Sequence, residues 1–390
     1  MKIALFHIMG SNFTGAAKTI FRLLCRVDLS KVQPILVGQT ENELTERTRS
    51  LGIPVSIVKY PAALDVYGKR LLRIRPRDFV AVLWGFCTYN ATLMGFLKET
   101  RPEVVWADNI RTFVFVYPAS KLSGCKIIWN IWSEPEGKVA WCLHRAGLLL
   151  ADLITLEYTT QSQKLFGRWG QVPFLRRKIT TVYTGVTDFT VRSGSNIRDE
   201  LRLSSKDLVV IMASNISAAK GQLDLLMAME TLVDKFPDMH LLVAGTPSTT
   251  DPDTKVYDSK LKRYTAEKGL TNNVHFLGWR SDIPDLLSAS DIYVSTSYTE
   301  SFPDAVREAM LFGIPVIATN VGGTSELVSE SKSGFLFEPG DLKSLVLHLT
   351  SLVENPQLRT TMGIEGKRII GVKFSTAVFA LEFEEMVRSL

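Results

Sequence analysis

Short apolar runs rich in β-branched residues alternate with segments of helix length from one end of the chain to the other. The strand candidates are Lys2–His7, Gln33–Val37, Val55–Val58, Val104–Trp106, Lys126–Ile131, Asp152–Leu156 and Ile179–Val182 in the first half, and Leu208–Ala213, His240–Ala244, Val274–Leu277, Ile292–Ser295, Pro315–Ala318 and Gly334–Phe337 in the second. Nearly continuous hydrophobic strands separated by helices indicate parallel sheets covered on both faces. Two such series in 390 residues predict an α/β protein with two doubly wound, Rossmann-like domains. Ligands of such sheets bind beyond the carboxyl ends of the strands, so we expect the domains to face a cleft that holds the site.

A polar stretch from Thr187 to Lys206 has few large apolar residues and marks the seam between the domains. We therefore expect a first domain at 1–190 and a second at 191–374. The last segment, 375–390, places Phe379, Phe383 and Met386 on one helical face. It is predicted to be an amphipathic helix that docks back on the first domain.

The composition, 46% hydrophobic and 22% charged, is that of a soluble globular enzyme. The four cysteines show no C-x-x-C spacing, which favours a reducing, cytoplasmic compartment. The start of the chain lacks the length and cleavage site of a secretory signal and is interpreted as a buried strand. The longest apolar stretch, Phe79 to Leu97, contains polar residues and glycines, so a buried helix is expected there rather than a membrane span.

The net charge of +5 is unevenly distributed, because residues 1–190 carry +11 and residues 191–390 carry −6. Two basic clusters lie in the first half: Lys69, Arg70, Arg73, Arg75 and Arg77, and then Arg176, Arg177 and Lys178. Either cluster could be ordinary solvated surface. Together with the charge asymmetry they also fit peripheral contact with an anionic membrane, on its cytoplasmic face, or with an anionic acceptor.

The segment from Glu300 to Pro315 carries the strongest chemical signal. Glu300 and Glu308 lie eight positions apart, Pro303 suits a first helical position, and Gly313 before Pro315 is a helix stop. Glu300 then lies in the loop before a helix and Glu308 lies on that helix. The N–H groups that follow Glu300 and the positive end of the helix dipole suit a bound anion with a polyol beside it, such as a nucleotide sugar.

Three other loops follow predicted strands of the second half. Lys220-Gly221 precedes a helix at Gln222–Leu232, and a cation there could hold a diphosphate. Gly278-Trp279-Arg280 could present an aromatic or backbone edge to a nucleobase, or Trp279 could pack between the domains. Gly322-Gly323 permits close backbone approach to the sugar or to Glu300.

Several other motifs fail. Gly10 to Gly15 mimics a phosphate loop but lacks the lysine directly after the second glycine, so it is interpreted as a loop at the cleft mouth. No G-x-G-x-x-G follows a strand, which argues against a dinucleotide-dependent dehydrogenase. Asp251-Pro-Asp253 is more typical of turn chemistry than of metal binding, the histidines show no ligand spacing, and no nucleophile elbow is present.

Residues Lys220 to about Pro339 resemble the donor domain of retaining glycosyltransferases of family 4, which have the two-domain GT-B fold. The matching stretches are Lys220-Gly221, Phe276-Leu-Gly278, Glu300-Ser-Phe-Pro303 with Glu308-Ala-Met310, Gly313 to Thr319, and Gly322-Gly323 with Glu326. They cover about a third of the chain and agree in order and spacing. The first half resembles the family only in its pattern of strands and loops.

The resemblance implies roles for individual residues. Glu308 would bind the ribose hydroxyls, Lys220 the diphosphate, and Glu300 would lie beside the donor sugar, with Lys220 and Glu300 as the catalytic pair. The rest of the implied nucleotide-sugar site is Gly278, Trp279, Arg280, Ser301, Phe302 and Pro303. No metal or other cofactor is expected, because the lysine and the helix dipoles offset the charge of the leaving group. Transfer would retain the anomeric configuration by front-face attack, with the departing phosphate helping to deprotonate the acceptor.

Two positions depart from the family. An arginine usually lies five or six positions before the lysine, where this chain has Asn215 and Ser214. Its loss removes a charge-assisted contact worth about 1.5–3 kcal/mol unless Asn215 or Arg280 substitutes. The usual histidine after the fifth strand of the first half is replaced by Trp132, so Asn130, Ser133 or Glu134 would have to contact the donor sugar.

The sequence thus predicts a metal-independent, hexosyltransferase-like enzyme of polysaccharide biosynthesis. It would move a sugar from a UDP- or GDP-linked donor to a glycan, lipid-linked or small-molecule acceptor; no nucleic acid partner is expected. Two alternatives stay open: a degenerate protein that binds a nucleotide sugar without transferring it, and a nucleotide-sugar epimerase.

Overall fold

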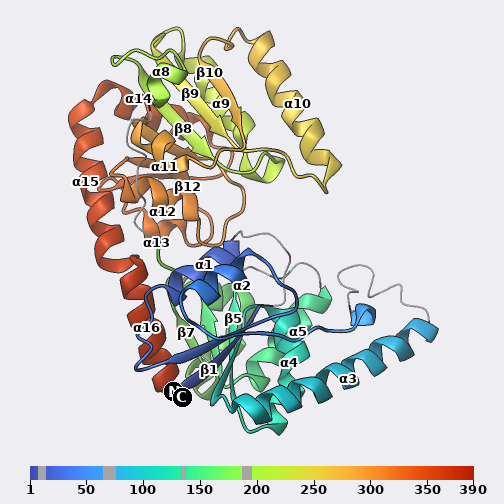
Figure 1. Cartoon of the computed structure of the whole chain (residues 1–390). Coiled ribbons are helices and arrows are strands. Elements are labelled where there is room, and N and C mark those ends of the chain that lie inside the picture. Colours follow the sequence, from blue (N-terminus) through green and yellow to red (C-terminus); the bar gives the residue numbers. More distant parts are fainter. Residues whose placement is uncertain (8–14, 65–75, 133–134, 136–137, 187–195) are drawn as a thin grey trace. The chain divides into compact units, whose positions relative to one another are not determined.

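The computed structural model describes every residue except 8–14, 65–75, 133–134, 136–137 and 187–195 (Figure 1). The chain forms two compact units, Met1–Gly185 together with Thr376–Leu390, and Val186–Ser375. Gly10, Glu134, most of the first basic cluster and part of the predicted seam lie outside the described residues.

The first unit is built on a seven-stranded parallel sheet with the strand order β3-β2-β1-β4-β5-β6-β7. Its strands are β1 Lys2–His7, β2 Gln33–Gly38, β3 Val55–Ile57, β4 Val104–Ala107, β5 Lys126–Ile131, β6 Leu153–Leu156 and β7 Ile179–Thr181. The strand order reverses between β1 and β4, which are hydrogen-bonded neighbours. In open α/β sheets this reversal is where ligands bind.

Helices cover both faces of this sheet (Figure 1). They are α1 Gly15–Leu24, α2 Glu43–Ser50, α3 Pro76–Thr100, α4 Ile110–Leu122, α5 Lys138–Leu150, α6 Gln161–Phe166, α7 Pro173–Arg176 and α16 Thr376–Arg388, with the 3₁₀ turns η1 Ala62–Leu64 and η3 Gly167–Gln171. Alternation along β1 sends Ala4 and Phe6 into the core under α3–α7, and Ile3 and Leu5 into the core under α1, α2 and α16.

The terminal helix α16 packs on the first unit. Phe379 and Phe383 enter the same core as the inner face of α1. The nearly buried carboxylate of Glu384 accepts hydrogen bonds from the Asp28 backbone N–H at 2.7 Å and from Lys31 Nζ at 3.1 Å. Apolar burial and these charge-assisted bonds together fix the helix.

The second unit contains a six-stranded parallel sheet with the order β10-β9-β8-β11-β12-β13. Its strands are β8 Leu208–Ala213, β9 Met239–Ala244, β10 Val274–Gly278, β11 Ile292–Ser295, β12 Val316–Thr319 and β13 Gly334–Phe337. Its helices are α8 Ile197–Glu200, α9 Gln222–Leu232, α10 Pro252–Glu267, α11 Ile283–Ser288, α12 Asp304–Leu311, α13 Thr324–Leu327, α14 Leu342–Glu354 and α15 Pro356–Lys373, with the 3₁₀ turn η4 Ala218–Lys220. Here the strand order reverses between β8 and β11. The prediction of two doubly wound parallel sheets is confirmed.

The prediction of a buried helix at Phe79–Leu97 is wrong for one of its faces. Tyr89, Leu93 and Leu97 are buried in the core, whereas Phe79 and Trp84 are 59% and 72% exposed. Within the described residues, Phe79–Thr100 is the one helix long and apolar enough to cross a membrane, and 28% of its most apolar window is buried. An apolar composition does not reveal which neighbours a helix has, and among the described residues the main helical neighbours of α3 are η1 and α4.

Candidate active site

The candidate site lies in the second unit, where the strand order reverses. Lys220 follows β8, Glu300 follows β11, and these strands are neighbours in the sheet. The Lys220 ammonium donates to Glu300 Oε1 over 2.6 Å, and Ser297 Oγ donates to the same oxygen over 2.7 Å. Both charged side chains are partly accessible, at 26% for Lys220 and 16% for Glu300. The structure therefore brings together the two residues that the sequence singled out as catalytic.

The loop that carries Lys220 and Gly221 is hydrogen-bonded to Thr296, directly after β11. Gly221 has φ +68°, and a Cβ atom there would lie 2.2 Å from the Thr296 carbonyl oxygen. Thr296 Oγ1 donates to the carbonyl oxygens of Lys220, at 3.1 Å, and Gly221, at 2.8 Å. A side chain at this position would push the two loops apart, so the close contact with the end of β11 requires glycine.

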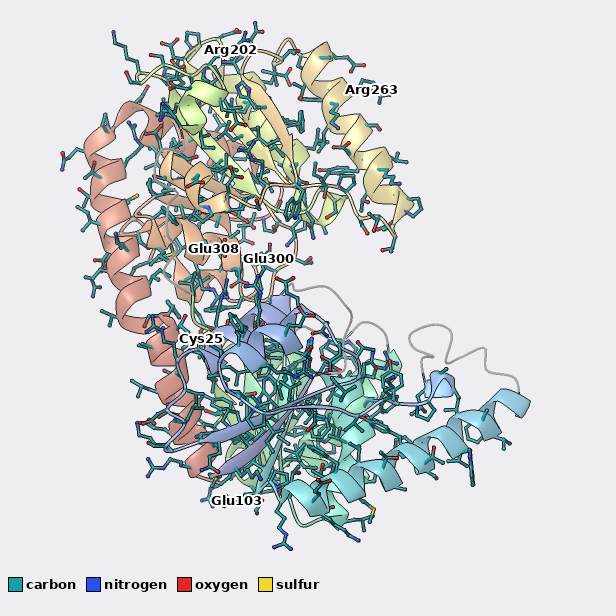
Figure 2. All side chains as sticks on the ribbon, viewed as in Figure 1. Cys25, Glu103, Arg202, Arg263, Glu300 and Glu308 are labelled. Carbon is teal, nitrogen blue, oxygen red and sulfur yellow. The ribbon has the colours of Figure 1, made fainter. Side chains whose placement is uncertain are left out.

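Glu308 lies on α12, and Glu300 lies in the loop that leads into it (Figure 2). Burial is the main cause that raises the pKa of Tyr293 in β11, and the charges of Glu300 and Glu308 raise it further. Both carboxylates therefore act on the same phenol. The predicted position of Pro303 is off by one residue: its ψ of 115° is extended, so it caps the helix and Asp304 begins it. Gly313 follows the helix with φ +74°, as a helix stop requires.

The Gly322-Gly323 loop packs directly against the turn after Glu300. A Cβ atom on Gly322 would lie 2.2 Å from the Glu300 carbonyl oxygen and 2.5 Å from that of Ser301. The Gly323 N–H donates to the Ser301 carbonyl over 2.6 Å. The predicted close approach of this loop to Glu300 is confirmed.

Arg307, which sequence reasoning missed, contacts the turn between Glu300 and α12 from the protein interior. It is 1% exposed and pairs with Asp304 at 2.6 Å. Its guanidinium lies 4.6 Å from the centre of the buried Phe302 ring, and Nη2 donates to the Phe302 carbonyl over 3.4 Å. The available signal was its place between Val306 and Ala309, which put a cation on the inner face of an amphipathic helix. Arg307 thus supports Phe302 and Pro303 from inside the protein.

The loop after β10 is less favourable to the predicted nucleotide contacts. Arg280 donates to the Glu200 carboxylate at 2.6 and 3.0 Å and to that of Asp282 at 2.7 and 2.8 Å. Its guanidinium is thus engaged on both edges, which argues against its replacing the family arginine. Gly278 has φ +66°, and Trp279 is 73% exposed and does not pack in the interior.

Ser214 and Asn215, at the positions of the usual family arginine, are hydrogen-bonded to a residue of α9. Gln222 Nε2 donates to Ser214 Oγ at 3.1 Å and to the Asn215 carbonyl at 2.9 Å. The Gln222 side chain is buried, and its Oε1 has no partner among the described residues. The loop after β8 is therefore held by a neutral amide, with Asn215 exposed.

In the first unit, the structure describes three of the predicted loop residues. Gly15 begins α1 with φ +42°. Asn130 is buried, and its Oδ1 accepts from Thr155 Oγ1 over 2.5 Å. Trp132, at the position of the usual family histidine, packs edge-on against Trp106 in the core, with ring centroids 6.0 Å apart. This tryptophan therefore has a structural role, which a donor-contacting histidine would not have.

Other candidates are accounted for locally. Asp251 caps α10 by accepting from the Asp253 N–H, so the turn interpretation is confirmed. Lys178 donates to the Leu149 and Ala151 carbonyls at the end of α5, whereas Arg176 and Arg177 are exposed.

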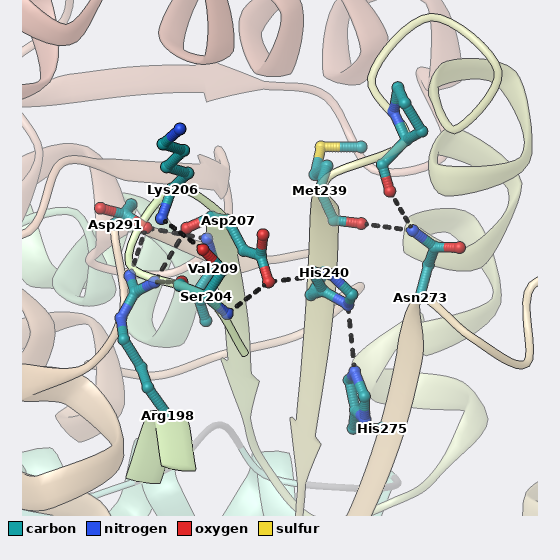
Figure 3. Close-up of polar contacts among 11 residues, drawn as sticks. Arg198, Ser204, Lys206, Asp207, Val209, Met239, His240, Asn273, His275 and Asp291 are labelled. Atoms are coloured by element: carbon teal, nitrogen blue, oxygen red, sulfur yellow. Dashed lines mark hydrogen bonds and ion pairs between the residues drawn. The ribbon is translucent and has the colours of Figure 1, made fainter. Parts of the chain in front are cut away.

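A cavity of about 370 Å³ lies near the amino ends of β8 and β9. Figure 3 shows polar contacts in this region, where Asp207 contacts His240 and Asp291 pairs with Arg198. Ligands of such sheets bind at the opposite, carboxyl ends of the strands, so this cavity is not the candidate site.

Comparison with known proteins agrees with this geometry. Residues 194–369 match the model of the family described as glycosyl transferases group 1. Spore coat protein SA of Bacillus subtilis (strain 168) is 26% identical over 285 residues, which are 70% of this chain and 69% of that protein. The lipopolysaccharide core biosynthesis mannosyltransferase LpsB of Rhizobium meliloti (strain 1021) is 28% identical over 251 residues, covering 56% of this chain and 70% of that one. The crystal structure of Anabaena Alr3699/HepE in complex with UDP is similar over 100% of both chains, with a TM-score of 0.78 and 21% identity.

The chain is a glycosyltransferase. Its second unit carries the group 1 domain, and both units together have the GT-B fold. In this glycosyltransferase, Lys220 and Glu300 lie within the matched region, at the end of the sheet where ligands of this fold class bind.

Proposed function

We propose that this glycosyltransferase transfers a sugar from a UDP- or GDP-linked donor to a glycan, lipid-linked or small-molecule acceptor, with retention of configuration and without a metal. The contact between Lys220 Nζ and Glu300 Oε1 at the strand reversal of the group 1 domain carries the proposal. UDP is named as the ligand of the similar Alr3699/HepE structure, which supports a uridine donor. The name of the relative LpsB supports a glycan acceptor.

The chemistry requires a group that accepts negative charge. As the bond between the anomeric carbon and the phosphate oxygen breaks, charge develops on the departing diphosphate. The Lys220 ammonium offsets that charge, assisted by the dipole of α9, which begins two residues later. The diphosphate would replace Glu300 as the partner of the ammonium, leaving this carboxylate to bind sugar hydroxyls.

Glu308 completes the donor site in this proposal. Its carboxylate is half-buried on α12 and acts on the same tyrosine as Glu300. A carboxylate can accept two hydroxyl hydrogen bonds, which suits the adjacent hydroxyls of a ribose. Retention is supported by the resemblance of the Glu300–Glu308 segment to retaining enzymes.

A membrane-bound acceptor is supported by the surface of the first unit. The exposed face of α3 presents Phe79, Leu83 and Trp84, and the chain has no charged residue between Phe79 and Leu97. Exposed Trp169 and Phe174 also lie in a segment that includes Arg168, Arg176 and Arg177. Aromatic side chains beside arginines suit the interface of an anionic bilayer, so we place this enzyme in the cytoplasm, peripherally on the membrane.

The test is a thermal-shift screen against UDP, GDP and their sugars, followed by measurement of nucleotide release and of the product anomer by NMR. A ligand at 100 times its Kd stabilises the protein by about 2.7 kcal/mol, which is readily detected. Glu308→Ala should weaken nucleotide binding, and Lys206→Ala, at an exposed lysine before β8, is the matched control. Binding without release over an acceptor panel would favour the degenerate alternative. Interconversion of donors without an acceptor would favour the epimerase.

A further inference from the structure

The turn between Glu300 and α12 is contacted from two sides within the second unit. The carbonyl oxygens of Glu300 and Ser301 face the Gly322-Gly323 loop, where a Cβ atom on the first glycine would lie 2.2 and 2.5 Å from them. The next carbonyl, that of Phe302, accepts from Arg307 Nη2 over 3.4 Å. Because the N–H of a planar trans peptide points opposite to its carbonyl, the N–H groups of Ser301 and Phe302 point away from the glycine loop. The two sets of contacts thus fix the direction in which this turn presents its donors.

The Phe302 ring is enclosed between a cation and a second ring. The Arg307 guanidinium lies 4.6 Å from the centre of the Phe302 ring, and the Phe374 ring meets it edge-on with centroids 5.6 Å apart. Phe302 is 5% exposed, and Phe374, which follows α15, is fully buried. The backbone and the side chain of Phe302 are therefore both held by Arg307.

Packing alone would not select an arginine on the inner face of α12. Removing a guanidinium from water costs several kcal/mol, and an apolar side chain of similar size would fill the position without that cost. The ion pair with Asp304, at 2.6 Å, offsets part of it, although this carboxylate is 33% exposed. The other buried residues of the helix are apolar: Val306, Ala309 and Met310. The cation is therefore better explained by the turn that it holds than by stability.

We propose that Arg307 is a positioning residue for the donor sugar, which fixes the turn so that the Glu300 carboxylate and the N–H groups after it meet the sugar hydroxyls. The inference rests on the proposed donor site. In the free protein the Glu300 carboxylate is held by Lys220 and Ser297. When the diphosphate takes Lys220, the carboxylate loses one of these partners, and its place then depends more on the backbone of the turn. Arg307 itself does not touch the substrate in this arrangement.

The binding test compares Arg307→Met with Val306→Ala, which truncates a fully buried neighbour on the same helix. Calorimetry measures the Kd values of UDP and UDP-glucose, or of GDP and GDP-mannose if the wild type prefers guanosine. Arg307→Met should weaken binding of the nucleotide sugar by about 10-fold and that of the free nucleotide by less than about threefold, because the nucleotide has no sugar to misplace. Val306→Ala should lower the midpoint of thermal unfolding but leave the ratio of the two Kd values unchanged.

A conservative variant keeps the test decisive if Arg307→Met does not fold. Arg307→Lys retains the charge but loses the planar group that stacks on Phe302 and donates in two directions. It should weaken binding of the nucleotide sugar by about threefold, between the wild type and Arg307→Met, with free nucleotide affinity unchanged.

A double-mutant cycle separates positioning from general support. If Arg307 acts through Glu300, Arg307→Met should weaken UDP-glucose binding much less in the Glu300→Gln background than in the wild type. Hydrogen exchange of the free protein gives a readout without any ligand. Peptides that cover 299–305 should exchange about 10-fold faster in Arg307→Met than in the wild type, and Val306→Ala should not show this increase.

Three results would overturn the inference: equal weakening of nucleotide and nucleotide sugar, additive effects in the cycle with Glu300→Gln, or unchanged exchange of the turn in Arg307→Met. A wild-type protein that binds neither UDP nor GDP would instead refute the proposed donor site. In that case the exchange of residues 299–305 would still decide whether Arg307 holds the turn.

Discussion

Because Lys220 is paired with Glu300, we expect substitutions of either residue to change the affinity for UDP in opposite directions. In the free protein the ammonium is already paired with Glu300 at 2.6 Å, and Ser297 holds the same carboxylate oxygen. A diphosphate must compete with Glu300 for the lysine. Glu300→Gln should therefore leave UDP affinity unchanged or improve it, because UDP has no sugar to lose a contact with this residue. Turnover of a nucleotide sugar should fall in the same variant.

Lys220→Ala should act in the opposite direction and by a larger amount. It removes a charge-assisted contact worth about 1.5–3 kcal/mol, or about 10- to 150-fold in Kd. It also leaves a carboxylate that is 16% exposed, without its cation and close to the diphosphate. Repulsion between the Glu300 carboxylate and the diphosphate should weaken UDP binding by Lys220→Ala further than loss of the lysine contact alone. The double variant Lys220→Ala/Glu300→Gln should therefore recover about 1 kcal/mol of binding, as two coupled neighbours do.

Calorimetric titration with UDP at low ionic strength measures all four Kd values in one thermodynamic cycle. Ser217→Ala in the loop before η4 serves as a control for local disturbance, since its side chain makes no capping hydrogen bond with η4. If Lys220→Ala bound UDP as well as the wild type, the assignment of the diphosphate site would be refuted. If the double variant bound no better than the single variant, the competition between Glu300 and the diphosphate would be refuted.

Three further predictions concern stability and surface. Gly221→Ala should lower the free energy of unfolding in urea by about 1–3 kcal/mol, because φ is +68° and the new Cβ would lie 2.2 Å from the Thr296 carbonyl oxygen. The control Gly95→Ala, within α3 where a Cβ meets no other atom, should raise it by about 0.5–1 kcal/mol. Equal effects of the two variants would contradict the strain argument. Burial and the neighbouring His240 lower the pKa of His275 below 6.5, so the unfolded chain binds this proton more readily than the folded protein does. The free energy of unfolding should therefore fall as the pH drops below about 6.5, and it should fall less in His275→Gln. Parallel pH profiles of unfolding for the two proteins would show that this imidazole contributes nothing. Trp84→Ser should weaken the flotation of the protein with vesicles that contain phosphatidylglycerol, whereas the control Val256→Ser, at a 70% exposed valine of α10, should not. Equal flotation of the wild type and both variants would exclude α3 as the membrane-facing surface.

Most strands could be predicted because each is a short apolar run bounded by polar residues, and burial on both faces demands that pattern. The ends differ by a residue, as at β12, where Pro315 precedes Val316–Thr319. Proline cannot donate to the ladder, so the strand begins after it. The exposed face of α3 could not be predicted, because sequence shows how apolar a helix is but not which neighbours it has.

The candidate site was predictable where it depended on local geometry and less so where it depended on pairing across the fold. Gly221 and Gly322 could be singled out from the sequence, because two backbone segments can approach this closely only where the residue has no side chain. The pairing of Arg280 could not be foreseen, because one of its two carboxylate partners, Glu200, lies 80 positions away. The contact of His7 Nδ1 with Asp108 Oδ2, at 2.5 Å, could not be foreseen for the same reason, because only the order of the strands makes β1 and β4 neighbours.

Transfer of a sugar to a hydroxyl produces two charges that must be placed, a negative charge on the departing diphosphate and a proton from the acceptor. Among the described residues, a pair of ionisable side chains lies at the strand reversal of each unit, Lys220 with Glu300 and His7 with Asp108. At Lys220 and Glu300 the group that can change partners is a cation, which suits an arriving anion. At His7 and Asp108 the carboxylate is buried and contacts Asn109, Thr112 and the imidazole, so this pair offers no ammonium to a second anion.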